Sequence, residues 1–233
     1  MQPEAILIDE MFTLFVPKHG MSRYVLYQLV IKKVLKRDVS LDEIKISYER
    51  QRKLLEKNLP PPHGYIWTII VAGVLLDLFP DLTFDEAILA GVKINEQILG
   101  NGDLYEMSRE SLDFLYEARK RNIKVILSSN HDREKLRKLI WYFRLGHLIH
   151  KVYTSSDVGY EKPNPSFFQS ILYKENLLAQ ECIMIGNNPI NDIAGAEAVK
   201  IRGVLLDHQG RFPNFTGIKI KNLTEIWNLT EIF

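Results

Sequence analysis

Short apolar runs without polar alternation recur along this chain of 233 residues. The clearest are AILI at residues 5–8, VIL at 125–127 and CIMI at 182–185. Strands buried on both faces read as continuous apolar runs, whereas strands with one wet face alternate apolar and polar residues. Helical segments separate several of these runs, so the pattern predicts a parallel sheet covered by helices on both faces. We therefore expect an α/β fold with a Rossmann-like, three-layer core.

The same reading assigns the individual elements of this core. Strands are predicted at residues 5–8, 124–127, 152–154, 182–185, 204–206 and 218–220. Helices are predicted at residues 108–121, 132–145, 165–175, 190–200 and 222–229. Helix and strand therefore alternate after residue 105, which is the order expected of a parallel sheet.

The stretch 17–105 differs, because it is helical in pattern and shows no β-type alternation. The segments 40–43 (SLDE) and 83–86 (TFDE) both match the capping box that opens a helix. Three prolines in 59–64 (LPPPHG) predict a break between helices. We expect residues 17–105 to be a helical domain, a lid or cap, inserted into a core of residues 1–16 and 106–233.

Composition excludes several classes of partner. A formal net charge of +1 argues against a nucleic-acid-binding surface, which needs a clustered excess of Lys and Arg. Cys182 is the single cysteine, so no internal disulfide can form. The longest apolar run, from Tyr65, is interrupted by Asp77 and is shorter than the ~20 residues that span a bilayer. With no signal-like start, we expect a cytoplasmic protein that binds neither nucleic acid nor membrane. The sequence leaves the oligomeric state open.

Polar residues follow three of the predicted strands. They are Asp9, Ser129 and the loop 186–192. Ligands of open parallel sheets bind in the crevice at the carboxyl ends of the strands. These residues therefore mark a candidate site on one rim of the sheet. His131, His147 and His150 show no metal-binding spacing and are interpreted as structural or exposed.

Four stretches in this order carry a resemblance to a known family: ILIDEMFTLF, VILSSN, GYEKPNPSFF and MIGNNPINDIAGAEA. They resemble the four signature motifs of the haloacid dehalogenase superfamily of hydrolases, and the helical stretch lies where that family inserts its first type of cap. The resemblance covers the whole chain. It implies phosphoryl transfer through an aspartate that forms an acyl-phosphate, assisted by a second Asp two residues later and by Mg²⁺.

Carried over residue by residue, the resemblance implies catalytic, phosphate-binding and metal-binding roles. The catalytic residues would be Asp9 as the nucleophile, with Ser129 and Lys162 holding and neutralising the phosphoryl oxygens. Thr13 and Asn130 would contact the phosphate. The Mg²⁺ ligands would be Asp9, Asn187 and Asp192.

Three positions depart from the family pattern. Met11 stands where phosphatases carry the acid/base Asp, and a thioether cannot transfer protons. Phe12 stands where glycine is usual, so we expect a different or tighter loop. Asn187 replaces the first acidic residue of the fourth motif, and hard cations prefer charged oxygens. Binding of Mg²⁺ is therefore predicted to be weak or absent.

Three functions remain open on this reading. The first is a hydrolase that acts weakly on a small phosphorylated metabolite, since losing acid/base help costs roughly 10²–10⁴ in rate. The second is a catalytically silent protein of this fold that binds a ligand or a partner protein. The third is hydrolysis at carbon of the dehalogenase type, which needs neither leaving-group protonation nor Mg²⁺.

Overall fold

The computed structural model describes residues 2–58, 66–131 and 133–229. The chain divides into two compact units. The first contains Met1–Val16, Met107–Arg133 and Arg144–Phe233, and the second contains Pro17–Glu106 and Glu134–Phe143. The predicted division into a core and an inserted helical domain of residues 17–105 stays a prediction. The predicted proline break at 59–64 lies outside the described residues.

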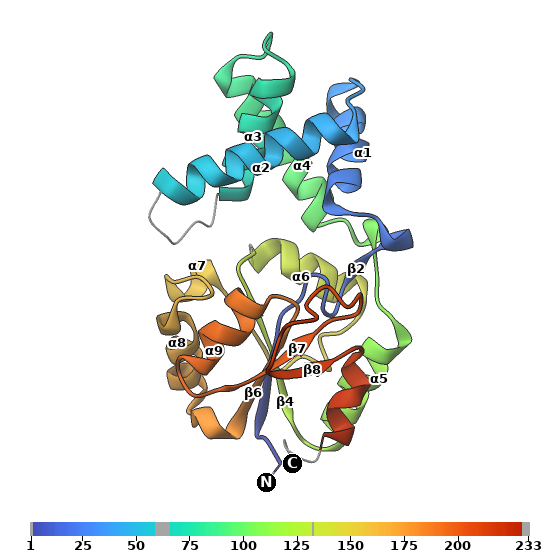
Figure 1. Cartoon of the computed structure of the whole chain (residues 1–233). Helices are drawn as coiled ribbons and strands as arrows, with labels where there is room; N and C mark the ends of the chain where they lie inside the picture. The colour runs from blue at the N-terminus through green and yellow to red at the C-terminus, as the bar shows by residue number, and fades with distance from the viewer. Residues whose placement is uncertain (1, 59–65, 132, 230–233) are drawn as a thin grey trace. The chain divides into compact units, whose positions relative to one another are not determined.

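A six-stranded sheet organises the first unit (Figure 1). In spatial order its strands are β5 (Lys151–Thr154), β4 (Lys124–Ser129), β1 (Ala5–Ile8), β6 (Cys182–Gly186), β7 (Arg202–Leu206) and β8 (Ile218–Ile220). All the pairings are parallel, and Ile8 of β1 is level with Leu127 of β4 and Ile185 of β6. The carboxyl ends of these three central strands therefore meet on one rim. This confirms the predicted α/β fold.

Helices cover both faces of this sheet (Figure 1). The helical elements of the first unit are α5 (Arg109–Lys120), α7 (Ser155–Val158), α8 (Pro165–Glu175), η3 (Ala179–Glu181), the π-helical turn η4 (Pro189–Ala194), α9 (Gly195–Glu197) and η5 (Leu223–Asn228). On one face, Leu7 and Met184 of the sheet pack in a buried cluster with Phe167 and Phe168 of α8. Elsewhere, Phe114 of α5 stacks on a Trp of η5 with ring centroids 5.4 Å apart.

The second unit is helical, as the sequence predicts. Its helices are α1 (Arg23–Leu35), α2 (Leu41–Asn58), α3 (Ile66–Leu78), α4 (Phe84–Leu99), the short η1 (Lys18–Gly20) and η2 (Gly102–Leu104), and most of α6 (Arg133–Tyr142). Both predicted capping boxes are confirmed: Glu43 N–H donates to Ser40 Oγ at 3.2 Å, and Glu86 N–H donates to Thr83 Oγ1 at 3.3 Å. No helix among the described residues is long and apolar enough to cross a membrane.

Two short strands were not predicted. β2 (Val16–Pro17) pairs with β3 (Tyr105–Glu106) in a separate two-stranded sheet. The stretch from residue 17 to residue 105, which is helical in pattern, therefore begins and ends in strand residues. Strands of two residues are too short to show a period of two, so periodicity could not reveal them.

Candidate active site

The loop after β1 is a tight turn that presents Asp9 at the rim. The Asp9 N–H donates to the Ile185 carbonyl at 2.9 Å, which continues the pairing of β1 with β6 by one residue. The N–H groups of Leu14 and Phe15 then both donate to the Glu10 carbonyl at 2.9 Å, so the chain folds back on itself. Phe12 inside this turn has φ of 60°, in the left-handed region that favours glycine. A side chain there costs roughly 1–2 kcal/mol, which the surrounding hydrogen bonds must offset.

Lys162 is the centre of a buried charge cluster. Its Nζ donates at 2.7 Å to Asp9 Oδ1, to Asp192 Oδ1 and to the Ser128 carbonyl. The side chains of Lys162 and Asp192 are 2% exposed, and that of Asp9 is 14% exposed. Burial works to lower the pKa of Lys162, but the charges of Asp192 and Asp9 outweigh it and raise that pKa. The ammonium is therefore a permanent positive charge beside Asp9.

Burial and neighbouring negative charges disfavour the ionised form of Asp9. Burial raises the pKa of Asp9 well above its ordinary value, the contact with Lys162 opposes this, and the nearby charges of Asp192 and Glu10 raise it further. A carboxylate that is desolvated and crowded by like charge is a stronger base and nucleophile than one in water. Perturbation of this kind at the end of a central strand is typical of a reactive group.

Asn130 fixes the main chain that carries Lys162. Its side-chain Oδ1 accepts from Lys162 N–H at 2.8 Å, and its Nδ2 donates to the Lys162 carbonyl at 2.9 Å. The amide thus engages both backbone groups of one residue, and both of its polar atoms are used. The predicted contact of Asn130 with phosphate stays a prediction.

Asp192 reaches Lys162 because the π-helical turn η4 directs its side chain inward. Asp192 Oδ2 accepts from Asn188 N–H at 3.0 Å, so both carboxylate oxygens have partners. The carboxylate also packs against Gly186, where an added Cβ would lie 2.3 Å from Asp192 Cγ. A larger residue at position 186 would therefore push Asp192 away from Lys162.

Thr13 and Ser129 also make hydrogen bonds to carboxylates of this site. Thr13 Oγ1 donates to Asp9 Oδ2 at 3.3 Å. Ser129 Oγ donates to Glu10 Oε1 at 2.8 Å and accepts from His131 N–H at 2.8 Å. The predicted residues Asp9, Thr13, Lys162 and Asp192 are thus joined by direct hydrogen bonds, and Ser129 is joined to Glu10, which follows Asp9.

Two members of the site, Glu10 and His131, are not among the predicted site residues. His131 Nδ1 contacts Glu10 Oε1, and the side chain of Glu10 is only 2% exposed. A second carboxylate, two residues after a fully apolar strand, is a usable signal for Glu10, since Glu is almost never buried without a partner. His131 has no metal-binding spacing, and nothing in the local sequence indicates its contact with Glu10.

The residues present do not fit a tightly held Mg²⁺. Of the predicted ligands, Asp192 already accepts from Lys162 and Asn188, and Asp9 shares the same ammonium. Asn187 offers an uncharged oxygen only. Among the residues that the structure describes, no cluster of three or more His, Cys, Asp or Glu could hold a metal ion. A hard divalent cation needs more free carboxylate oxygen than this.

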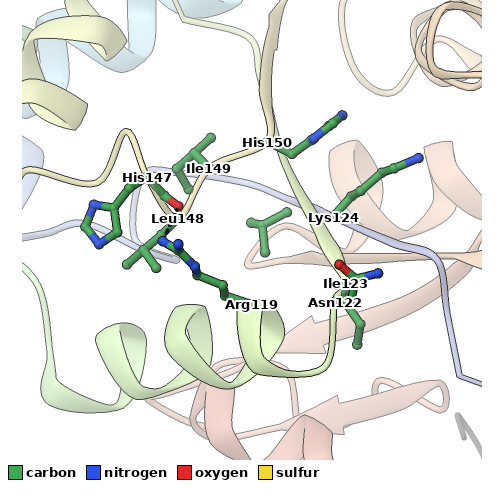
Figure 2. A pocket seen from close by; sticks show the side chains of 9 residues that line it. Arg119, Asn122, Ile123, Lys124, His147, Leu148, Ile149 and His150 are labelled. Carbon is green, nitrogen blue, oxygen red and sulfur yellow. Dashed lines mark hydrogen bonds between the residues drawn. The ribbon is translucent and has the colours of Figure 1, made fainter.

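A hollow of about 350 Å³ lies at the amino ends of the strands, opposite the rim that carries Asp9 (Figure 2). It is lined by Arg119, Asn122, Ile123, Lys124, Val125, His147, Leu148, Ile149 and His150. Lys124 begins β4 and His150 immediately precedes β5, so the hollow lies at the amino ends of these strands. Its basic groups are largely engaged: Lys124 Nζ contacts Glu4 at 2.7 Å and His150 Nε2 contacts Glu175 at 3.0 Å. The hollow shares no residue with the Asp9 cluster.

The chain is similar in sequence to a known family of hydrolases and to two phosphatases. The family model described as haloacid dehalogenase-like hydrolase matches residues 78–206, more than half of the chain. The phosphoserine phosphatase of Thermus thermophilus is 32% identical over 103 residues, which cover 44% of this chain and 41% of that protein. The glyceraldehyde 3-phosphate phosphatase of Methanothermobacter thermautotrophicus is 29% identical over 114 residues, covering 46% of this chain and 49% of that protein. The chain thus spans less than half the length of these two curated relatives.

The fold also matches solved structures over nearly its full length. The structure of YfnB from Bacillus subtilis, bound to magnesium, superposes with a TM-score of 0.78 at 12% identity and covers 98% of both chains. Identity this low establishes a shared fold and no more. The agreement covers both the sheet unit and the helical unit.

Proposed function

This chain belongs to the haloacid dehalogenase-like hydrolases, and we propose that it hydrolyses a small phosphorylated metabolite with Asp9 as the nucleophile. The observation that carries the proposal is the contact of 2.7 Å between Lys162 Nζ and Asp9 Oδ1 at the end of the central strand. An acidic oxygen beside a buried ammonium suits an incoming phosphate, because the ammonium neutralises charge on the phosphoryl oxygens. That two relatives are phosphatases of small metabolites supports this choice of substrate.

The chemistry would take place in two steps. In the first, an Asp9 carboxylate oxygen attacks the phosphorus, the bond to the leaving oxygen breaks, and an aspartyl phosphate forms. In the second, water attacks the phosphorus and the bond to Asp9 breaks, which releases phosphate. Lys162 would neutralise charge in both steps, and Asp192 would hold its ammonium in place. The hydroxyl of Thr13 supports the orientation of Asp9.

We expect the activity to be weak, because Met11 stands where a proton-transferring carboxylate would help. The test is to assay the purified protein with 4-nitrophenyl phosphate, with and without Mg²⁺, beside the double variant Met11→Asp with Asn187→Asp. We expect measurable turnover by the natural protein and a higher rate in the double variant, which adds a proton-transferring carboxylate at position 11 and a charged Mg²⁺ ligand at position 187. If only the double variant turns over, the natural protein is a silent member that binds a ligand or partner. Release of halide from a short 2-haloacid, without phosphatase activity, would instead indicate dehalogenation.

We also propose that Mg²⁺ binds this chain weakly. Asn187→Asp adds the charged oxygen that the site lacks, so we expect at least a tenfold gain in Mg²⁺ affinity. Calorimetric titration of both proteins with Mg²⁺ measures this directly, and no turnover is needed. Asn191→Asp adds the same charge to the same turn and serves as the matched control. Equal Mg²⁺ affinity of the natural protein and the Asn187 variant would contradict the prediction.

A further inference from the structure

A histidine joins the site through a buried carboxylate. Glu10 is the second residue after β1, which ends at Ile8, and His131 is the second residue after the neighbouring strand β4, which ends at Ser129. The pairing of β1 with β4 therefore brings these residues to one rim. His131 Nδ1 contacts Glu10 Oε1, and the side chain of His131 is 21% exposed, so part of the imidazole reaches solvent.

Glu10 is held as a charged carboxylate. Burial works to raise its pKa, but the charge and hydrogen bond of His131, together with Lys162 and Ser129, lower the pKa of Glu10 to about 2. Its Oε1 accepts from Ser129, while its buried Oε2 has no hydrogen-bond partner among the described residues. A buried oxygen without a partner lowers the stability of the folded protein. Packing alone does not account for keeping such a group next to the candidate nucleophile.

The contact with Glu10 fixes the orientation of the imidazole. A carboxylate can only accept, so the proton on His131 lies on Nδ1, and proton exchange with a substrate would take place at the second nitrogen, Nε2. This arrangement, a carboxylate that orients a histidine, is a common way to prepare an imidazole for proton transfer.

Few other groups of the site can move a proton. Lys162 is bound by two carboxylates and stays charged, and both oxygens of Asp192 already accept hydrogen bonds. Asp9 is needed as the nucleophile, and Met11 has no acidic or basic group. Among the described titratable residues joined to this cluster by direct hydrogen bonds, His131 is the one whose side chain is both basic and partly exposed.

We propose that His131, oriented by Glu10, is the catalytic acid and base of the phosphatase reaction proposed above. In the first step, Nε2–H of the imidazolium gives its proton to the leaving oxygen as the bond from phosphorus to that oxygen breaks. In the second, the neutral Nε2 takes a proton from the water that attacks the aspartyl phosphate, and the bond from phosphorus to Asp9 breaks. The imidazolium is then restored. Glu10 is a positioning residue that touches neither phosphate nor water.

The charged groups that the structure places near His131 belong to the site and to the start of α6. Glu10 faces it directly, and Asp9 and Lys162 lie next to Glu10 in the cluster. Arg133, two residues further on, pairs with Asp157 at 2.6 Å. Residue 132 lies outside the described residues.

The sharpest test compares two substrates that differ only in the leaving group, phenyl phosphate and 4-nitrophenyl phosphate. Phenolate is the poorer leaving group and needs the proton more. We expect His131→Ala to slow the first-turnover release of phenol by roughly 10²–10⁴ and that of 4-nitrophenol far less. Added imidazole should restore part of the lost rate. With 4-nitrophenyl phosphate, the variant should also accumulate phosphorylated protein, seen by mass spectrometry, because the second step lacks its base.

A second variant and a control keep the result clear. His131→Asn keeps a donor towards Glu10 but cannot transfer a proton, so it should fold normally and show the same losses. His150 also pairs with a carboxylate, through its Nε2 to Glu175 at 3.0 Å, but at the amino ends of the strands, so His150→Ala should change neither rate. One limb of the profile of kcat against pH should vanish in both His131 variants and persist in the His150 variant.

Two failures can be told apart. If the natural protein hydrolyses neither phosphate, the proposed function itself fails. If it hydrolyses both in an Asp9-dependent way, but the His131 variants slow both first turnovers equally and keep the full pH profile, only the role of His131 is wrong.

Discussion

Replacing Lys162 with methionine is expected to lower the free energy of unfolding by about 3–5 kcal/mol. The substitution keeps much of the side-chain volume but leaves Asp9 and Asp192 buried and close together without a counter-ion. Uncompensated buried charge is among the most destabilising changes a folded protein can carry. Urea unfolding of the natural protein and the variant at neutral pH measures the difference.

The pH dependence of this loss of unfolding free energy follows from the direction in which folding shifts the pKa of Lys162. The pKa of Lys162 is raised on folding, so its stabilising contribution is complete below the unfolded value of about 10.4 and is lost only above it. The titration of Lys162 should therefore add no pH dependence to the difference in unfolding free energy between the two proteins from about pH 6 to pH 8. Lys120→Met is the control, since Lys120 is 77% exposed and pairs with Glu117 at 3.4 Å. A surface pair is worth about 0–1 kcal/mol, so equal losses in the two variants would contradict a buried role for Lys162.

Asp9→Asn is expected to abolish phosphatase turnover, by at least about 10⁴-fold, because an amide cannot form the aspartyl phosphate. The variant should fold normally. Folding raises the pKa of Asp9, so its ionisation opposes stability at neutral pH and ceases to do so below the unfolded value. The variant should therefore be at least as stable as the natural protein near pH 7, and the difference should shrink towards about pH 4.

Asp207 provides a matched control for this result. It is buried directly after β7, and its carboxylate accepts from the N–H groups of Arg211 at 2.8 Å and Phe212 at 3.0 Å. Asp207→Asn should lose stability and keep its turnover per folded molecule. Full activity of Asp9→Asn, measured as phosphate release, would remove Asp9 from the chemistry.

Much of the sheet could be predicted because burial on both faces leaves a plain trace in the sequence. The runs at β1, β4 and β6 are apolar throughout, and all four residues of Ala5–Ile8 are fully buried. The segment after β6 was harder. A helix was predicted at 190–200, but the chain forms the π-helical turn Pro189–Ala194 and then the short helix Gly195–Glu197. The wider turn accompanies the inward side chain of Asp192, and hydrophobic periodicity carries no sign of such a constraint.

Some residues of the site could be predicted from the sequence and others could not. The resemblance could assign roles to Asp9, Lys162 and Asp192 because each falls within a motif of fixed spacing. The pair formed by Glu10 and His131 could not be found in this way, since its members are 121 residues apart and meet only because β1 and β4 are neighbours. Predicting the pair required the strand order of the sheet, which the sequence alone does not fix.

The side chain of Asn130 behaves towards Lys162 as a paired strand would, with one donor and one acceptor meeting the same peptide unit. The stem of the cation is thus anchored before any phosphate arrives. The ammonium of Lys162 is therefore in position before an anion binds. A mobile lysine would have to reorganise in every catalytic cycle, whereas here this ordering is completed once, when the protein folds.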